Sequence, residues 1–206
     1  MKIRKQNGSR NDRFIDRQLG ISTCGIEEWD GTEHLYHRFE STSYRALDFL
    51  FSHYTPDEDA FLVDYGCGLG RINFYFHHQF GIGGYGLEVH EDRLERARKN
   101  LDGYNRRQME NADIRFIHDK AEQHEPLPKS NLFYFFNPFV ASIFADAFAA
   151  IVKSLERADR PADLILYYPN RDYLNILARQ RVFKPLYLVD LSWNDDDRDY
   201  FMIYRH

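Results

Sequence analysis

The sequence predicts a single α/β domain built on a doubly wound, mostly parallel sheet, and two observations support this prediction. First, apolar runs of strand length alternate with segments of helical periodicity from residue 61 to residue 181. Second, the last two apolar runs flank an acidic turn at 192–199, which is typical of a closing antiparallel hairpin. A chain of 206 residues with 43% hydrophobic side chains is long enough to bury one full core.

Each element follows from its local pattern. Apolar residues at helical spacing predict a helix over residues 44–54, with Ser41, Thr42 or Ser43 as its N-cap. Residues 61–65 form a continuous apolar run, which predicts a buried parallel strand. The same reasoning predicts helices over 71–80, 91–101, 144–155 and from 173 onward, and strands over 85–89, 114–118, 132–136, 164–168, 186–191 and 200–204. The sheet is therefore expected to have seven strands.

Composition divides the chain into three parts. Residues 1–13 are polar and rich in Lys and Arg, so we expect a flexible basic tail, with an RNA-contacting arm as the alternative. Residues 14–55 are too apolar for a free tail and are expected to form an N-terminal helical cap that acts as a lid. Residues 56–206 contain the alternating strands and helices and are expected to form the ligand-binding domain.

The overall charge and the cysteine content limit the classes of protein that fit. Lys and Arg number 27 against 32 Asp and Glu, and the net charge of −5 argues against a surface built to bind phosphate backbones. Two cysteines and the lack of a secretory signal pattern predict a reducing, cytoplasmic setting. The apolar stretch 132–152 is interrupted by Asn137, Pro138 and Asp146, so we expect no membrane span.

A glycine-rich loop directly after the first strand carries the main functional signal. The run Asp64-Tyr65-Gly66-Cys67-Gly68-Leu69-Gly70-Arg71 lets the backbone turn sharply and approach a ligand. Glu88 ends the second strand. In nucleotide-binding α/β folds, a carboxylate at this position accepts hydrogen bonds from the ribose hydroxyls. The loop reads G-x-G-x-G and not the G-x-G-x-x-G of dinucleotide enzymes, and Asp64 would repel a pyrophosphate. A ligand with a cationic amino-acid end fits better, and S-adenosylmethionine is such a ligand.

Three motifs together resemble the class I, Rossmann-like S-adenosylmethionine-dependent methyltransferases. They are VDYGCGLGR at 63–71, GLEV at 86–89 and FFNPF at 135–139, and the resemblance extends from about residue 56 to the end of the chain. FFNPF is similar to the N-P-P-Y motif of amino-group methyltransferases but lacks its second proline.

This resemblance implies a set of site residues. The first motif would hold the methionine portion of the cofactor, Glu88 the ribose, and residues 119–121 the adenine. The implied cofactor-binding residues are Asp64, Gly66, Cys67, Gly68, Gly70, Arg71, Glu88, Asp119, Lys120, Ala121 and Asn137. Asn137 and Tyr168 are the expected catalytic residues, at the ends of the fourth and fifth strands. Tyr36, Thr42, Tyr44, Pro138 and Phe139 are the expected substrate contacts.

The predicted function is methyl transfer from S-adenosylmethionine to an oxygen or nitrogen nucleophile of a small molecule or a protein side chain. Two alternatives remain: amino methylation of a nucleic acid, favoured by 137–139 and the basic tail, and a non-catalytic module that holds the cofactor or S-adenosylhomocysteine. A nicotinamide-dependent dehydrogenase ranks below these because of the loop pattern. We expect no metal, because His34 with His37, His77 with His78, and 195–197 lack the partners of known sites.

Overall fold

The computed structural model describes residues 10–27, 35–191 and 196–206. Its main sheet has seven strands in the order β5-β4-β3-β6-β7-β9-β8. The strands are β3 (Leu62–Tyr65), β4 (Gly84–Glu88), β5 (Ile114–His118), β6 (Leu132–Phe135), β7 (Asp163–Tyr167), β8 (Lys184–Asp190) and β9 (Tyr200–Arg205). Neighbours from β5 through β7 are parallel, and β9 pairs antiparallel with both β7 and β8. The predicted fold class is therefore confirmed.

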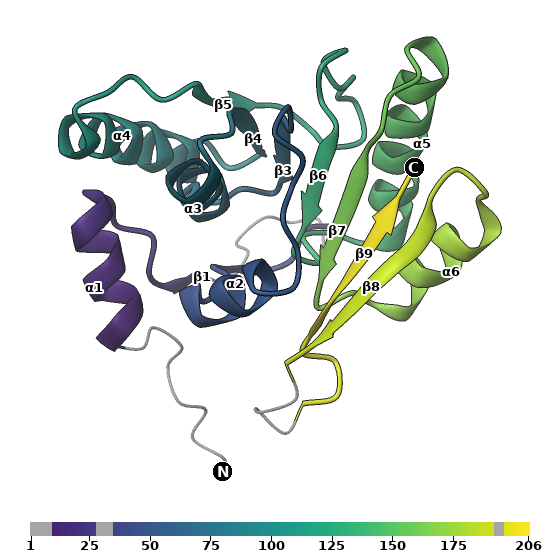
Figure 1. Cartoon of the computed structure of the whole chain (residues 1–206), viewed down its shortest axis with the longest axis horizontal. Helices are drawn as coiled ribbons and strands as arrows, with labels where there is room; N and C mark the ends of the chain where they lie inside the picture. The colour runs from purple at the N-terminus through teal and green to yellow at the C-terminus, as the bar shows by residue number, and fades with distance from the viewer. Residues whose placement is uncertain (1–9, 28–34, 192–195) are drawn as a thin grey trace.

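Helices cover both faces of this sheet (Figure 1). They are α2 (Tyr44–Phe51), α3 (Arg71–Phe80), α4 (Glu91–Gln108), α5 (Ala141–Arg157) and α6 (Arg171–Arg179). The bounds of α3 and β5 agree with the sequence prediction. Helix α4 continues to Gln108 instead of ending near residue 101, because Tyr104 extends its buried face. It ends where Met109 adopts a left-handed conformation with φ 56°.

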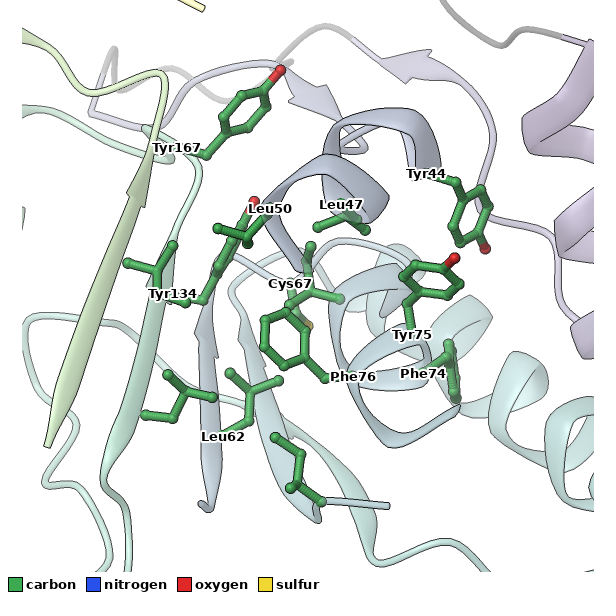
Figure 2. Close-up of a cluster of buried hydrophobic side chains, with 14 of the residues drawn as sticks. Tyr44, Leu47, Leu50, Leu62, Cys67, Phe74, Tyr75, Phe76, Tyr134 and Tyr167 are labelled. Atoms are coloured by element: carbon green, nitrogen blue, oxygen red, sulfur yellow. The ribbon is translucent and has the colours of Figure 1, made fainter. Parts of the chain in front are cut away.

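Two hydrophobic clusters result from the alternation of side chains along the strands. Leu62, Leu132 and Tyr134 face α2, α3 and α4 on one side of the sheet. Phe133 and Phe135, from the same β6 strand, face α5 and α6 on the other side. Figure 2 shows the first cluster, with Leu47 and Leu50 of α2 directed toward Cys67, Phe76 and Tyr134. Helix α2 and Cys67 of the glycine-rich loop thus belong to the same cluster.

The N-terminal region combines helices with a short ribbon. Helix α1 (Arg10–Leu19) precedes β1 (Ile26–Glu27), which pairs antiparallel with β2 (Phe39–Glu40). Ser43 caps α2 by accepting a hydrogen bond from the backbone N–H of Ala46 at 3.2 Å. Residues 14–55 were expected to be helical, and the ribbon is an addition to that prediction.

Helix α1 also changes the expected N-terminal boundary. It includes residues 10–13, which the sequence assigned to a flexible tail, and Asp12 within it is buried. Residues 1–9 of that tail, together with His34 and Asp195, lie outside the described residues. Within the described part of the chain, no helix combines the length and apolar character needed to cross a membrane.

Candidate active site

A cavity lies at the carboxyl ends of β3, β4 and β6, where the strand order reverses on either side of β3. Ligands of open α/β sheets bind at such a switch point. The cavity encloses about 780 Å³, part of which is open to solvent. Among the residues expected at the site, those that line it are Tyr36, Thr42, Asp64, Gly66, Cys67, Arg71, Glu88, Asp119, Ala121, Pro138 and Phe139.

The glycine loop is held in a conformation that side chains rarely adopt. Gly66, Gly68 and Gly70 have φ values of 80°, 53° and 88°. The backbone N–H groups of Gly66 and Cys67 both donate to the carbonyl of Leu87 at 2.9 Å, which ties the loop to β4. A Cβ on Gly66 would lie 2.6 Å from Cβ of Pro138. Glycine is therefore required here both by backbone angle and by close packing.

Replacing Gly68 with alanine tests the contact between the loop and β2. A Cβ on Gly68 would lie 2.2 Å from the ring of Phe39, whereas one on Gly81, which also has a positive φ of 71°, meets nothing within 4 Å. We expect Gly81→Ala to cost about 1–2 kcal/mol in backbone strain, and Gly68→Ala to cost about 1–3 kcal/mol more through overpacking. Urea unfolding measures both. Equal losses in the two variants would show that the Phe39 contact is absent.

Three backbone amides fix the carboxylate of Glu88. Gly68 N–H donates to Oε2 at 2.9 Å, and the N–H groups of Val89 and His90 donate to Oε1 at 3.0 and 2.9 Å. A carboxylate has about four acceptor positions, so one remains for a ligand hydroxyl. The residue is buried yet lines the cavity. Glu88 therefore joins the glycine loop to β4 and presents one acceptor to the cavity.

We expect Glu88→Ala to weaken the affinity for S-adenosylhomocysteine by about 1–3 kcal/mol, the range for a lost hydrogen bond to a charged group. Isothermal titration calorimetry measures this change. Because the variant also removes the acceptor of three amides, thermal unfolding must show that it is folded. Glu91→Ala, at the exposed start of α4, is the matched control. A folded variant with wild-type affinity would refute the ribose assignment.

Asp64 is the most unusual group in the cavity. It is 3% exposed, and none of the described residues donates a hydrogen bond to its carboxylate. Burial, and then the nearby charge of Glu88, raise the pKa of Asp64 well above its usual value. A buried charge without a partner is costly, so a ligand that supplies a cation or hydrogen-bond donors would satisfy it. The same burial raises the pKa of the Cys67 thiol well above its usual value, which keeps Cys67 protonated.

The expected adenine region is formed by the turn after β5. Asp119 accepts hydrogen bonds from the backbone N–H of Lys120 and from Nδ1 of His124, both at 2.8 Å. His124 in turn contacts the hydroxyl of Tyr85 at 2.9 Å. Asp119 and Ala121 line the cavity, while the exposed Lys120 does not. The contribution of Lys120 to this region is therefore its backbone.

Arg71 lines the cavity but is engaged by the N-terminal segment. Its guanidinium lies 3.0 Å from Oδ2 of Asp12 and 3.8 Å from Oδ1 of Asp16. It also donates to Thr23 Oγ1 at 2.7 Å and to the carbonyl of Thr42 at 3.0 Å. These contacts hold α1 and the segment before α2 at the start of α3. Arg71 therefore has contacts within the protein, and its predicted contact with the cofactor stays a prediction.

Two of the expected substrate residues have structural contacts. Tyr44 is fully buried, and its hydroxyl donates to Asp16 at 2.7 Å, so its expected place in the substrate pocket is wrong. Thr42 does line the cavity, with its hydroxyl 2.8 Å from that of Tyr134.

Two glycines of the loop that were expected to contact the cofactor do not line the cavity themselves. Gly70 is the N-cap of α3 and packs against the ring of Phe116. Gly68 reaches the site through its hydrogen bond to Glu88.

The two expected catalytic residues share an uncommon backbone conformation. Asn137 and Tyr168, which follow β6 and β7, have φ values of 38° and 51°. Such strain in non-glycine residues is concentrated at functional sites. Neither side chain lines the cavity, however: Asn137 Oδ1 accepts a hydrogen bond from Asn170 at 3.0 Å, and Tyr168 donates its hydroxyl to Asp196. In this structure both side chains support the strand ends, and their direct catalytic roles stay predictions.

Several residues that line the cavity were not among the site residues expected from the sequence, and Phe39, Arg93 and His37 are three of them. Phe39 lies against Gly68, and the guanidinium of Arg93 lies 5.4 Å from the centroid of the Phe39 ring. Arg93 belongs to α4 and also donates a hydrogen bond to Glu27 of β1 at 3.2 Å. This hydrogen bond connects the ribbon of β1 and β2 to α4. His37 is the third and lies beside residues 137–138. Across the described residues, no group of three His, Cys, Asp or Glu side chains is arranged to hold a metal ion.

Comparisons with known proteins agree with this architecture. No family model matches the chain, and no curated protein matches its sequence. Among solved structures, an RNA methyltransferase from Salinibacter ruber in complex with S-adenosyl-L-homocysteine has 18% identity and a TM-score of 0.58, covering 81% of this chain and 92% of that one. Magnesium protoporphyrin IX methyltransferase from Synechocystis with bound SAM has 14% identity and a TM-score of 0.52, over 79% and 75% of the two chains.

A third similar structure is a putative rRNA-methylase from Clostridium thermocellum, with 14% identity, a TM-score of 0.57, and coverage of 82% of this chain and 97% of that one. These similarities define the fold: the chain has the α/β fold of class I S-adenosylmethionine-dependent methyltransferases. The resemblance drawn from the three sequence motifs is thus confirmed at the level of the fold.

Proposed function

We propose that the protein is a methyltransferase that uses S-adenosylmethionine to methylate an oxygen or nitrogen nucleophile of a small molecule or a protein side chain. The observation that carries this proposal is the buried Asp64 carboxylate, which lines the cavity beside Glu88 without a hydrogen-bond donor among the described residues. The α-ammonium of S-adenosylmethionine supplies the donors and the charge that this carboxylate requires.

The remaining cavity residues fit the other parts of the same molecule. Glu88 offers an acceptor to the ribose, and Asp119 and Ala121 lie where the adenine would bind. Phe39, Phe136 and Phe139 provide aromatic surface in the cavity. Aromatic faces attract cations, and S-adenosylmethionine supplies a positively charged sulfonium whose methyl group is ready for transfer. Alignment and exclusion of water by these residues would supply most of the acceleration.

The charge distribution supports a small-molecule or protein acceptor over a nucleic acid. The chain has a net charge of −5. A net negative charge disfavours the binding of a polyanion. The amide of Asn137, on which the amino-methylation alternative depends, is bonded to Asn170 and does not line the cavity.

Transfer of tritium from methyl-labelled S-adenosylmethionine into a fractionated cell extract tests this proposal. We expect label in the small-molecule or protein fraction and none in RNA or DNA. Label in nucleic acid alone would establish the amino-methylation alternative. Binding of S-adenosylhomocysteine with no label in any fraction would instead establish a binding module without turnover.

A further inference from the structure

One side chain in the cavity is positioned as a base. Residues 35–40 run alongside the loop that follows β6, because His37 N–H donates to the carbonyl of Pro138 at 2.9 Å and Val140 N–H donates to that of Leu35 at 2.8 Å. Tyr36 and Phe139 form a β-bridge between the same segments. The backbone of His37 is therefore fixed next to the strand end that carries the expected acceptor contacts Pro138 and Phe139.

The hydrogen bond of the His37 ring determines its tautomer. Nδ1 lies 2.7 Å from the carbonyl oxygen of Asn137. A carbonyl oxygen only accepts hydrogen bonds, so Nδ1 must carry the proton. In the neutral ring the lone pair is then on Nε2. Within the described parts of the chain, no residue forms a hydrogen bond with Nε2 of His37. The left-handed backbone at Asn137 belongs to the same loop that orients this ring.

The other titratable groups of the cavity are engaged elsewhere. Glu40 forms an ion pair with Arg38 at 2.9 Å, and Tyr36 donates its hydroxyl to Glu122 at 3.3 Å. Asp119 accepts from His124, and Glu88 accepts from three amides. Asp64 is assigned to the ammonium of the cofactor. His37 therefore presents a basic atom, Nε2, that the described residues leave available to an acceptor.

We propose that His37 is the general base of the methyl transfer, acting through Nε2. This inference rests on the proposed function and names the class of acceptor: one that carries a proton on its nucleophilic atom at neutral pH, such as a hydroxyl or a protonated amine. The acceptor atom forms a bond to the methyl carbon while the carbon–sulfur bond breaks, with both electrons of that bond going to sulfur. The acceptor proton moves to Nε2 of His37 and from there to water.

Two isosteric variants separate this catalytic role from a structural one. In His37→Asn, the amide nitrogen takes the place of Nδ1 and keeps the hydrogen bond to Asn137, while Nε2 is removed. In His37→Gln, the amide nitrogen takes the place of Nε2 and the hydrogen bond to Asn137 is lost. His53→Gln, at an exposed position in the turn after α2, is the control. Each protein is tested for S-adenosylhomocysteine affinity, thermal unfolding, and single-turnover tritium transfer into the extract fraction that wild type labels.

We expect His37→Asn to keep wild-type affinity and stability while transfer falls by about 10²–10⁴-fold, the usual contribution of general acid–base catalysis. Free imidazole should restore part of the transfer in His37→Ala. Nitrogen-15 shifts of histidine-labelled wild type should show that the neutral form of the His37 ring carries its proton on Nδ1.

Three outcomes would overturn the inference. The first is methyl transfer by His37→Asn at the wild-type rate. The hydrogen bond to Asn137 would then account for the whole role of His37, and the proposed function would be unaffected. The second is a neutral ring protonated at Nε2. The third is a wild-type protein that binds S-adenosylhomocysteine but labels no fraction, in which case the proposed transfer fails as well.

Discussion

Asp64→Asn should bind S-adenosylhomocysteine about 10- to 150-fold more weakly than wild type, while the ligand-free protein becomes more stable at alkaline pH. The loss of binding free energy is about 1.5–3 kcal/mol, the range for a hydrogen bond to a charged group. The gain in stability at alkaline pH follows from the pKa of Asp64 in the folded state, which burial and the charge of Glu88 raise. Calorimetric titration measures the affinity, and thermal unfolding as a function of pH measures the stability.

The sign of the pH effect follows from proton linkage. The folded protein holds the Asp64 proton more tightly than the unfolded chain, in which the pKa is near 3.8. The corresponding stability is present below that pH and is lost as the pH rises through the raised folded-state value. Asp64→Asn removes this loss. The ammonium of the ligand favours the ionised carboxylate, so wild-type affinity should increase with pH over the same range.

Asp146→Asn, exposed on α5, is the control for these measurements and should change neither quantity. At a pH below the raised pKa of Asp64, binding to wild type should release a proton, which is detected as a dependence of the binding enthalpy on the ionisation enthalpy of the buffer. A variant that loses stability at every pH and retains its affinity would contradict the assignment of Asp64, because the carboxylate would then be stabilised by the protein itself.

Arg71→Met should lower the free energy of unfolding by about 3–5 kcal/mol, the range for removing one partner of a buried ion pair. For a chain of this length, the corresponding decrease in Tm is roughly 6–20 °C. The reason is that Asp12 and Asp16 are both nearly inaccessible and face the Arg71 guanidinium, which is 3% exposed. Chemical denaturation monitored by circular dichroism measures the change.

The control for Arg71→Met is Arg106→Met on the exposed face of α4, for which we expect little change. The double variant with Asp12→Ala should lose less than the sum of the two single variants, since each removes the same pair. Sequence alone assigned Arg71 to the cofactor. Undiminished stability with abolished binding of S-adenosylhomocysteine would support that first assignment and refute the structural one.

Local periodicity was sufficient to predict the main sheet and most of its helices. The buried strands are continuous apolar runs, and α3 begins directly after the last glycine of the loop. Each of these patterns lies within a few consecutive residues and can therefore be recognised in the sequence. The ribbon of β1 and β2 was not predicted, because two strands of two residues each show no period. Helix α4 was predicted too short since Tyr104 is the only buried aromatic in its last turns.

The candidate site was predicted where its residues follow strands in sequence. Asp64, Glu88 and Asp119 each lie at or just after a strand end, and all three line the cavity. The contacts of Arg71 were not predictable in this way, since its partner Asp12 is 59 positions away and belongs to a segment that was expected to be a flexible tail. His37 was considered only as a metal ligand, because its contact with Asn137 spans 100 positions. Such long-range contacts leave no local pattern.

Titration calorimetry of the wild-type protein with S-adenosylhomocysteine, compared with a nicotinamide dinucleotide, tests most directly whether the cavity around Asp64 and Glu88 holds an adenosyl amino acid. We predict saturable binding of one S-adenosylhomocysteine per chain, tighter than that of the dinucleotide and accompanied by proton release. The absence of binding heat and of any thermal shift, or tighter binding of the dinucleotide, would contradict the assignment of this site.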